Sequence, residues 1–254
     1  MTRDERGPVQ TTERSLDIIE TLRELDGGRL TEVSSHLDLP DSTVHNHLRT
    51  LLQRGYIVKE NNIYRVSLRF LDFGEYARSR RKIYDGAKAE VDELAGKTGE
   101  AANLLVEENG KGVFLYTAAD QNAVPLDIHP GKHVFLHATA LGKVILAHLP
   151  EGRVNEIIAQ HGLPALTRST ISDADELFAE LERVRENGYG FDDEERLRGM
   201  RCAAVAIKNE HGQVIGAISV SGPASRMDPA GPSDDLVDEL LSTKNIIELK
   251  LAYS

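Results

Sequence analysis

The sequence predicts an α+β fold in two parts, a small N-terminal domain and a larger C-terminal one. Apolar residues recur at helical spacing through residues 12–53 and then give way to two short β-rich runs. Beyond residue 80 the apolar pattern alternates between strand-like and helix-like segments, as in a mixed α+β domain. A chain of 254 residues is long enough for each part to bury a core of its own.

The first element is predicted to be an amphipathic helix over Thr12–Leu25. Leu16, Ile19 and Leu22 fall three residues apart, which places them on one face of a helix. Gly27 and the glycine after it are expected to end this helix, because glycine favours the conformation that follows a helix C-terminus.

Two shorter helices are predicted next. One covers Leu30–Leu37, with Thr31 as its expected N-cap, and the other runs from Ser42, also a good N-cap, to about Gln53. Pro40 separates them, because proline disfavours a helical conformation in the residue before it.

A β-hairpin is predicted after the third helix. The runs 56–58 and 63–66 are rich in β-branched and aromatic residues, and Asn61-Asn62 between them is a hairpin-type turn. Three helices followed by a hairpin are the elements of a winged helix-turn-helix.

The rest of the chain is expected to begin with helical residues 68–97, kinked around Tyr84–Gly86. Asn109-Gly110, a strong hairpin signal, joins the first two strands of the second part. The expected strands are 101–106, 112–118, 203–207 and 214–220, and the expected helices are 138–149, 154–161, 173–187 and 233–252.

Composition narrows the class of protein. No apolar stretch is long enough to span a bilayer, and the polar residues 1–10 do not resemble a signal peptide. Cys202 is the single cysteine, so an intramolecular disulfide is excluded and a reducing compartment fits. A cytoplasmic protein without a membrane partner is therefore expected.

The distribution of charge favours nucleic acid as a partner of the N-terminal part, although the net charge of the chain is −11. The first 80 residues hold 12 Lys and Arg against 13 Asp and Glu, so most of the negative charge lies in the remainder. Residues 42–59 contain no carboxylate but include Arg49, Arg54 and Lys59. Screening by salt limits the reach of distant charge to roughly 8 Å, so a local basic face is sufficient to meet phosphates.

The third helix is the expected DNA-reading element, because it has polar residues on one side and apolar residues on the other. Asn46 is suited to adenine, and Arg49 to guanine or a phosphate. The candidate DNA-binding residues are Thr31, Ser42, Thr43, Val44, His45, Asn46, His47 and Arg49. The alternative is an ordinary three-helix bundle with a polar surface helix.

Several motifs in the same order resemble those of the IclR family of transcription regulators. In the N-terminal part they are SLDII at 15–19, LTEV at 30–33 and LPDSTVH at 39–45. In the C-terminal part they are HATALGK at 137–143, GYGFDDEE at 188–195, GMRCAA at 199–204 and GAISVSGP at 216–223. The resemblance extends from about Gln10 to Tyr253.

The resemblance implies a winged helix-turn-helix DNA-binding domain at 8–70, a linker helix at 71–84 and a GAF-like effector-binding domain at 85–254. It also implies homodimers, or dimers of dimers, that bind double-stranded operator DNA and control catabolic operons in response to a small carbon-source metabolite. The effector-binding residues that it implies are Thr139, Ala140, Leu141, Asp192, Cys202, Ser219 and Ser221.

The residues themselves are compatible with such a pocket. A helix that begins near Thr139 offers free backbone N–H groups to an anion or a hydroxyl. Ser219 and Ser221 are two apart on a predicted strand, so both hydroxyls point to the same face. A bound polar ligand would supply the partners that these hydroxyls need, although neighbouring backbone is the alternative partner.

Two other function classes remain open from the sequence. One is an enzyme with Cys202 as nucleophile beside His137 and Asp192, although no hydrolase signature surrounds the cysteine. The other is a ligand-sensing module whose winged helix binds protein. No cofactor is expected, and a metal site at His129, His133 and His137 is disfavoured because Pro130-Gly131 interrupts any helix there.

Overall fold

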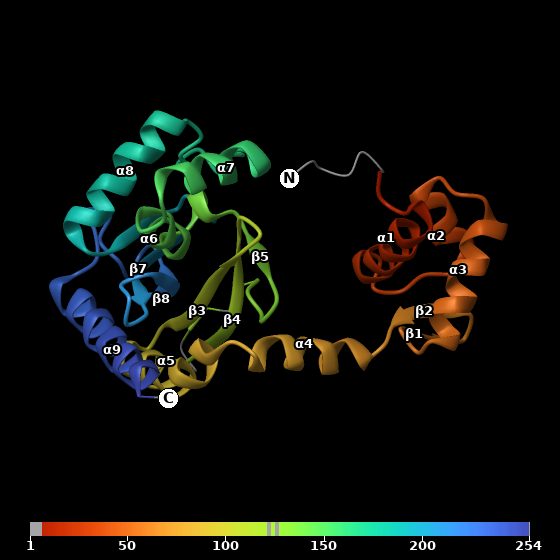
Figure 1. Ribbon diagram of the computed structural model, residues 1–254, viewed down its shortest axis with the longest axis horizontal. Helices are drawn as coiled ribbons and strands as arrows, with labels where there is room; N and C mark the ends of the chain where they lie inside the picture. The colour runs from red at the N-terminus through yellow and green to blue at the C-terminus, as the bar shows by residue number, and fades with distance from the viewer. Residues whose placement is uncertain (1–6, 121–122, 125–126, 254) are drawn as a thin grey trace. The chain divides into compact units, whose positions relative to one another are not determined.

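The computed structural model describes residues 7–120, 123–124 and 127–253 (Figure 1). Within them the chain forms two compact units, which meet in the sequence between Ala77 and Arg78. The elements of the N-terminal unit are α1 (Gln10–Glu24), α2 (Leu30–Leu37), α3 (Asp41–Gln53), β1 (Ile57–Glu60), β2 (Ile63–Val66) and α4 (Arg69–Ser79), the last of which ends two residues into the second unit.

The N-terminal unit has its own apolar core, to which all three helices and the hairpin contribute. Ile18 of α1, Val33 of α2 and Leu48 of α3 are fully buried in it, and Ile57 of β1 closes it from the hairpin side. Val33 and Leu48 are positions that the apolar spacing assigns to the inner faces of their helices. In α1 the buried positions are Ile18 and Leu22, whereas Leu16, which was expected on the same face as Leu22, is 55% exposed. The predicted winged helix-turn-helix is therefore confirmed.

The hairpin also forms as expected. Strands β1 and β2 are antiparallel, and Glu60 pairs with Ile63 across the turn. Asn61 and Asn62 have φ angles of 49° and 66°. This left-handed conformation at both central residues is the one that a type I′ turn requires and that asparagine tolerates.

The expected helix caps in this unit are wrong. The residue before α2 is Arg29, whose backbone N–H is bonded by Glu32 Oε2 at 2.6 Å, so Thr31 lies inside the first turn. Helix α3 starts at Asp41 with Pro40 before it, and the side chain of Ser42 makes no cap. Proline fits this place because its own φ is fixed and it needs no partner for an N–H group.

The helix break after α4 lies earlier than expected. Helix α4 ends at Ser79, and α5 (Lys82–Thr98) continues without interruption through Tyr84–Gly86. Gly86 is a site of close packing, because a Cβ atom there would lie 3.0 Å from Leu251 Cδ2. The glycine was interpreted as a break because the sequence does not reveal the helix that packs against it.

The C-terminal unit is built around one six-stranded antiparallel sheet in the order β5-β4-β3-β8-β7-β6. The strands are β3 (Ala101–Glu108), β4 (Lys111–Ala119), β5 (His133–Val134), β6 (Gly190–Asp193), β7 (Met200–Lys208) and β8 (Val214–Pro223). The remaining helices are α6 (Ala140–Ala147), α7 (Glu151–His161), α8 (Ala174–Asn187) and α9 (Asp234–Ala252).

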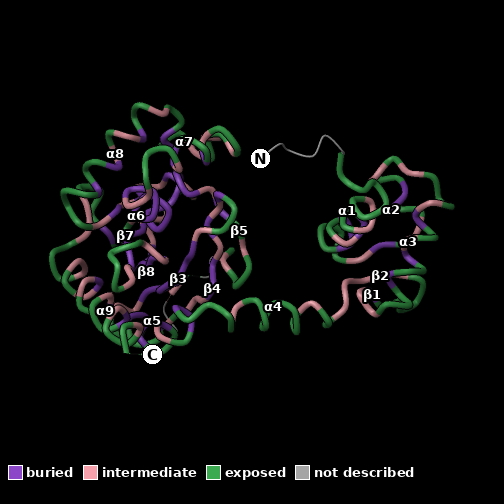
Figure 2. The backbone as a smooth tube through the Cα atoms, in the orientation of Figure 1, coloured by how far each residue is buried: buried purple, intermediate pink, exposed green. Residues whose placement is uncertain are grey.

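Both faces of this sheet are covered, and its central strands β3 and β8 are buried over most of their length (Figure 2). Helices α5 and α9 pack on one face, where Leu104 and Ile218 contribute to the core. Helix α6, with α7 and α8 around it, packs on the other face, where Leu105 and Ala217 lie. Consecutive strand residues thus enter opposite cores, as the two-residue period of a strand requires.

Two short strands and one helix start differ from the sequence prediction. Strands β5 and β6 are only two and four residues long, too short for a periodic signal. The helix expected from residue 138 begins at Ala140, after a single 3₁₀ turn over Leu136–Ala138. None of the helices in the described part of the chain combines the length and apolarity needed to cross a bilayer.

Candidate functional site

The outer face of α3 is polar and exposed. Ser42, His45, Asn46 and Arg49 are all solvent-exposed, as is Thr50 one position further on. Asp41 is the single acidic residue of the helix and lies in its first turn, where a carboxylate favours the positive end of the helix dipole. The rest of the face, and the chain up to Lys59, has no carboxylate.

Three of the other predicted DNA-binding residues have different surroundings. Val44 is fully buried in the core of the unit, so its side chain supports α3 and cannot contact DNA, which corrects the prediction for this residue. His47 is half-buried, and its Nδ1 lies 2.8 Å from Ser15 Oγ of α1. Thr43 is also half-buried, whereas Thr31 is exposed on α2.

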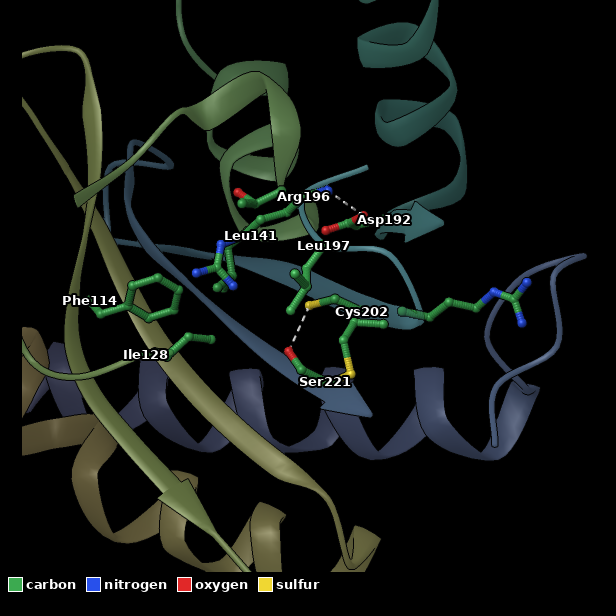
Figure 3. A pocket seen from close by; sticks show the side chains of 11 residues that line it. Phe114, Ile128, Leu141, Asp192, Arg196, Leu197, Cys202 and Ser221 are labelled. Carbon is green, nitrogen blue, oxygen red and sulfur yellow. Dashed lines mark hydrogen bonds between the residues drawn. The ribbon is translucent and has the colours of Figure 1, made fainter. Parts of the chain in front are cut away.

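A cavity lies inside the C-terminal unit between α6, the sheet and the segment that joins β6 to β7 (Figure 3). It encloses about 390 Å³ of space not filled by atoms, part of it open to solvent. The part of it that the centre of a water-sized molecule can occupy is only about 30 Å³, room for a few waters, so the walls must move apart to admit a metabolite. The lining residues are Phe114, Ile128, Thr139, Leu141, Asp192, Arg196, Leu197, Met200, Arg201, Cys202 and Ser221.

Five of the seven predicted effector-binding residues line this cavity, although they come from four separate segments of the sequence. They are Thr139, Leu141, Asp192, Cys202 and Ser221. The other two, Ala140 and Ser219, are fully buried and are not part of the lining.

The other lining residues were not among the predicted site residues. Phe114 lies on β4, and Ile128 belongs to the segment after it; neither is marked by a local motif. Arg196, Leu197 and Met200 follow the acidic run Asp192–Glu195, and this position in the sequence was the one available signal for them.

The start of α6 is fixed tightly against the wall of the cavity. Thr139 is the N-cap, and its Oγ1 accepts a hydrogen bond from Gly142 N at 2.9 Å. A Cβ atom at Gly142 would lie 2.0 Å from the carbonyl oxygen of Leu136. Glycine is therefore required for α6 to approach the preceding turn this closely, and this approach positions Thr139 and Leu141.

A row of hydrogen-bonded polar side chains crosses the sheet behind the cavity. Thr117 Oγ1 donates to Asn103 Oδ1 at 2.6 Å, and Asn103 Nδ2 donates to Ser219 and Ser221, both at 3.2 Å. Ser221 in turn donates to Cys202 Sγ at 3.1 Å. The two serine hydroxyls do face the same side, and their partner is the amide of Asn103 rather than backbone.

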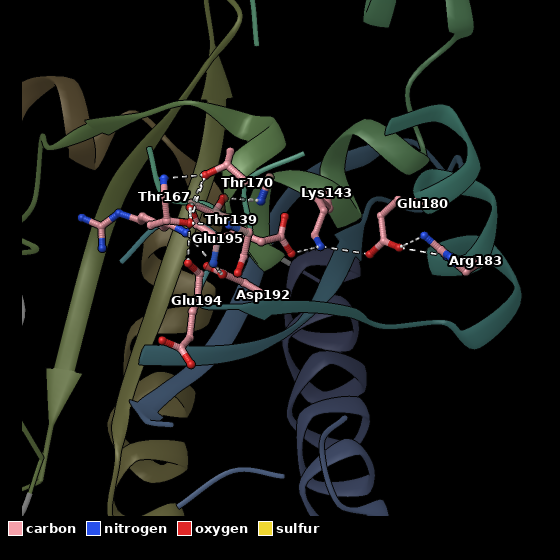
Figure 4. A network of polar contacts seen from close by, with 12 residues as sticks. Thr139, Lys143, Thr167, Thr170, Glu180, Arg183, Asp192, Glu194 and Glu195 are labelled. Carbon is pink, nitrogen blue, oxygen red and sulfur yellow. Dashed lines mark hydrogen bonds and ion pairs between the residues drawn. The ribbon is translucent and has the colours of Figure 1, made fainter. Parts of the chain in front are cut away.

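Two of the four acids that follow α8, Asp192 and Glu195, are buried, whereas Asp193 and Glu194 between them are partly exposed (Figure 4). Asp192 Oδ1 accepts from the backbone N–H of Glu195 at 2.7 Å. Glu195 forms an ion pair with Lys143 Nζ at 2.5 Å, and Glu180 of α8 contacts the same ammonium at 2.9 Å. Lys143 is 1% exposed, so the ion pair ties α6 to both neighbours.

These surroundings shift the pKa values of the acids. Burial, with the charge of Glu195 as the second cause, raises the pKa of Asp192 to about 7. Burial also raises the pKa of Glu195, against the opposing effect of Lys143. For Lys143, burial lowers the pKa, but the charges of Glu195 and Glu180 outweigh it and the net shift is upward. A buried ammonium with two carboxylates close by stays charged.

Cys202 lacks the setting of a nucleophile. Burial, together with the charge of Asp192, raises the pKa of its thiol to about 11, so the thiol is neutral at physiological pH. His137, its expected base, lies near Pro164 O with its Nε2 at 3.2 Å and does not line the cavity. The geometry therefore does not provide the thiol with a base.

The three histidines considered for a metal site make local contacts instead. His129 Nδ1 lies 2.9 Å from Pro130 O, and His133 Nδ1 lies 3.0 Å from Gly131 O. Among the residues that the structure describes, no group of three or more His, Cys, Asp and Glu side chains is arranged to hold a metal ion.

Both units match models of known protein families. The model described as "Bacterial transcriptional regulator IclR C-terminal" matches residues 76–248, and the model described as "IclR helix-turn-helix domain" matches residues 11–61. Together these matches cover most of the chain.

Full-length relatives and solved structures agree with these matches. The chain is 32% identical over 244 residues to "Probable HTH-type transcriptional regulator ArcR" of Halobacterium salinarum, covering 93% of this chain and 92% of the relative. It is 31% identical over 254 residues to the "Acetate operon repressor" of Salmonella typhimurium, covering 97% and 91%. The crystal structure of the Thermotoga maritima IclR superposes with a TM-score of 0.79 at 25% identity, covering 96% and 99%.

These similarities run through both units and decide between the function classes that the sequence left open. The matched families consist of regulators and not of enzymes, which removes the alternative of a cysteine-dependent enzyme. The chain belongs to the IclR family and is a transcriptional regulator of this type.

Proposed function

We propose that this regulator binds a specific operator sequence in double-stranded DNA through the exposed face of α3. The observation that carries the proposal is the polar, almost acid-free surface of this helix in a chain whose net charge is −11. Ser42, His45, Asn46 and Arg49 would enter the major groove, with Thr31 and Thr43 toward the phosphates. His47 would act mainly through its contact with Ser15, by fixing α3 on α1.

The wing would add contacts on the neighbouring backbone. Lys59 is exposed at the end of β1, and its ammonium lies 4.9 Å from the ring centroid of Tyr64. This contact positions the ammonium over the ring of Tyr64. We infer the division of the chain into a DNA-binding domain at 8–70, a linker helix at 71–84 and an effector domain at 85–254, with a homodimer or a dimer of dimers as the working form.

The cavity of the C-terminal unit would bind the effector, a sugar, a sugar acid or another organic acid used as a carbon source. Thr139, Leu141, Asp192, Cys202 and Ser221 would contact it, while Ala140 and Ser219 shape the walls from behind. The similarity to the Acetate operon repressor supports control of a catabolic operon. We infer a cytoplasmic location from the same role.

The DNA-binding proposal is tested by titrating the purified chain against duplex DNA from its own upstream region, at several salt concentrations. Arg49→Ala is expected to weaken binding by about 5- to 150-fold, as for an arginine that contacts a base edge or a phosphate. The control Arg23→Ala removes an exposed arginine from α1 and is expected to leave affinity nearly unchanged.

Two outcomes would count against the proposal. If the unmodified chain ignores this DNA at low salt, with and without candidate metabolites, DNA binding by α3 is wrong. If Arg49→Ala binds as well as Arg23→Ala, Arg49 lies outside the interface. A separate thermal-shift screen tests the cavity, since a ligand at 100 times its dissociation constant adds about 2.7 kcal/mol to the free energy of unfolding.

A further inference from the structure

Two arginines line the proposed effector cavity, and they differ in how their guanidinium groups are used. The guanidinium of Arg201 is hydrogen-bonded to three protein groups. Its Nε donates to Asp193 Oδ1 at 2.6 Å, and its Nη1 donates to the carbonyl oxygens of Ala224 and Met227, both at 2.6 Å. Its side chain is 11% exposed, and Glu194 lies 3.9 Å away as a second acidic neighbour. Arg201 is therefore a structural residue of this wall.

Among the described residues, the guanidinium of Arg196 makes one hydrogen bond. Its Nη2 donates to the backbone carbonyl of Asp127 at 3.3 Å, and no ion pair involves it among the residues that the structure describes. A guanidinium has five N–H donors, so most of its capacity remains unused. Figure 3 shows this group projecting toward the side of the cavity where Phe114 and Ile128 lie.

The acids closest to Arg196 in the sequence are already engaged elsewhere. The carboxylate of Asp192 accepts from the backbone N–H groups of Glu195 and Arg196, at 2.7 and 3.4 Å. Glu195 is paired with Lys143. Glu194 Oε2 accepts from Gly199 N at 2.7 Å. None of them is bonded to the Arg196 guanidinium, and the carboxylate of Asp127, the other acid near it, is paired with Lys132 at 2.7 Å.

We propose that Arg196 selects an effector that carries a carboxylate, by forming a charge-assisted pair with it at the rim of the cavity. This inference rests on the proposed effector site and adds the residue that recognises the carboxylate of the ligand. The planar guanidinium matches a carboxylate with two parallel hydrogen bonds. The apolar part of the same ligand lies against Phe114, Ile128 and Leu197.

The segment of Arg196 is positioned to make this pair with little reorganisation. Thr167 Oγ1 donates to Glu194 O at 2.7 Å, and Thr170 Oγ1 donates to Glu195 O at 2.6 Å. Asp192 fixes the following backbone N–H groups. The backbone on which Arg196 stands is thus held before a ligand arrives, which reduces the ordering cost of binding.

The test compares matched probes on matched variants of the full chain. The anionic probes are pyruvate, gluconate and benzoate, and their neutral partners are pyruvamide, sorbitol and benzamide. Dissociation constants are measured by calorimetry for the unmodified chain, Arg196→Gln, Arg196→Lys and Arg198→Gln. Arg198 is an exposed arginine in the same segment that does not line the cavity, so its substitution makes the same charge change.

We expect at least one carboxylate to bind at least 10-fold more tightly than its neutral partner. Arg196→Gln weakens that carboxylate by roughly 10- to 100-fold, the effect of losing a charge-assisted pair, and leaves neutral probes unaffected. Arg196→Lys restores part of the loss because it keeps the charge, and Arg198→Gln stays within about 2-fold of the unmodified chain. Circular dichroism of each variant checks that it is folded.

Each other outcome overturns the inference in a recognisable way. Equal binding of the carboxylate by Arg196→Gln and Arg198→Gln excludes Arg196 as its receptor. If only neutral probes bind and they alter operator binding, the proposed effector site is supported but the selection of a carboxylate by Arg196 is wrong. If no probe of either charge binds the folded chain, both the inference and the effector cavity as proposed are wrong for these classes of metabolite.

Discussion

Asp192 shows how a single residue is tuned by its place in the fold. It follows α8 on the short strand β6, where its side chain is buried at the wall of the cavity and lies near a second acid, Glu195. Both features disfavour the charged form, so its pKa of about 7 lies far above the ordinary value of 3.8. The residue thus changes charge near physiological pH.

Asp192 is expected to make the stability of the C-terminal unit fall as pH rises from about 4 to about 7. Between these values the folded chain keeps a proton that the unfolded chain has lost, so the free energy of unfolding decreases by at most about 1.4 kcal/mol per pH unit. Asp192→Asn keeps an oxygen acceptor but cannot ionise. The free energy of unfolding of this variant, relative to that of the unmodified chain, should therefore increase as pH rises across this range. Urea unfolding at pH 5, 6, 7 and 8 measures the difference.

An exposed acid provides the control for this prediction. Asp175→Asn on α8 removes a carboxylate that faces water. Its free energy of unfolding should change with pH in the same way as that of the unmodified chain. If that of Asp192→Asn also changes in this way, Asp192 does not hold its proton in the folded state.

For individual residues, the sequence predicted the cavity residues that belong to a motif, but not those that the fold brings into the cavity from elsewhere. The motifs indicated Thr139, Leu141, Asp192, Cys202 and Ser221, and these do line one cavity. Phe114 and Ile128 carry no signal, because a residue on a strand or in a loop enters a cavity through the fold and not through its neighbours in sequence. Val44 was included among the DNA-binding candidates because it lies within the motif of α3, but its side chain is fully buried in the core of the N-terminal unit.

Among the helices and strands, α6 depends most on a single position. Gly142 allows its first turn to approach the carbonyl oxygen of Leu136, which a Cβ atom would meet at 2.0 Å. Gly142→Ala is therefore expected to destabilise the C-terminal unit by several kcal/mol, beyond the usual range for one substitution, or to prevent it from folding. Chemical denaturation measured by circular dichroism gives the change.

The same substitution at Gly152 of α7 separates this clash from the general effect of replacing glycine in a helix. No atom lies within 4 Å of a Cβ atom built there. Gly152→Ala should raise the free energy of unfolding by about 0.5–1 kcal/mol, because alanine favours a helix. Similar effects of the two substitutions would mean that α6 moves away from Leu136 at little cost.

Elements with a long periodic pattern were predictable, and elements defined by their neighbours were not. Helix α2 has the predicted bounds, and the β1–β2 hairpin turns at the predicted asparagines. Strands β5 and β6 exist because a longer strand lies beside each of them, on β4 and β7 respectively. The uninterrupted course of α5 through Gly86 similarly depends on Leu251 of α9.

For the whole molecule, the main feature is that each unit has a core made from its own residues. Leu48 lies in the core of the N-terminal unit, and Leu181 of α8 lies in a core of the C-terminal unit. The strong asymmetry of charge between the two parts was visible in the sequence, because counting residues needs no coordinates. The extent of each core was not visible, because it depends on which helices cover the sheet.

Because each unit has its own core, a substitution in one core is expected to destabilise that unit and not the other. Leu48→Ala is expected to cost about 2–5 kcal/mol by leaving a cavity, so that the melting transition of the N-terminal unit and DNA binding are both lowered. The transition of residues 78–254 should stay in place, whereas Leu181→Ala should have the reverse effect. Differential scanning calorimetry resolves the two transitions, and a common shift of both by either variant would contradict independent cores.

The row of side chains from Thr117 to Cys202 imposes a direction on whatever occupies the cavity. Each side chain donates a hydrogen bond to the next, so the hydroxyl proton of Ser221 is used in the bond to Cys202 Sγ. A lone pair of the Ser221 oxygen remains available to accept a hydrogen bond from a ligand. A ligand can therefore donate a hydroxyl or N–H hydrogen bond to Ser221. A negatively charged group of the ligand is better accommodated beside the unused N–H donors of Arg196. A metabolite that carries both an acid and an alcohol would therefore be oriented by these two residues.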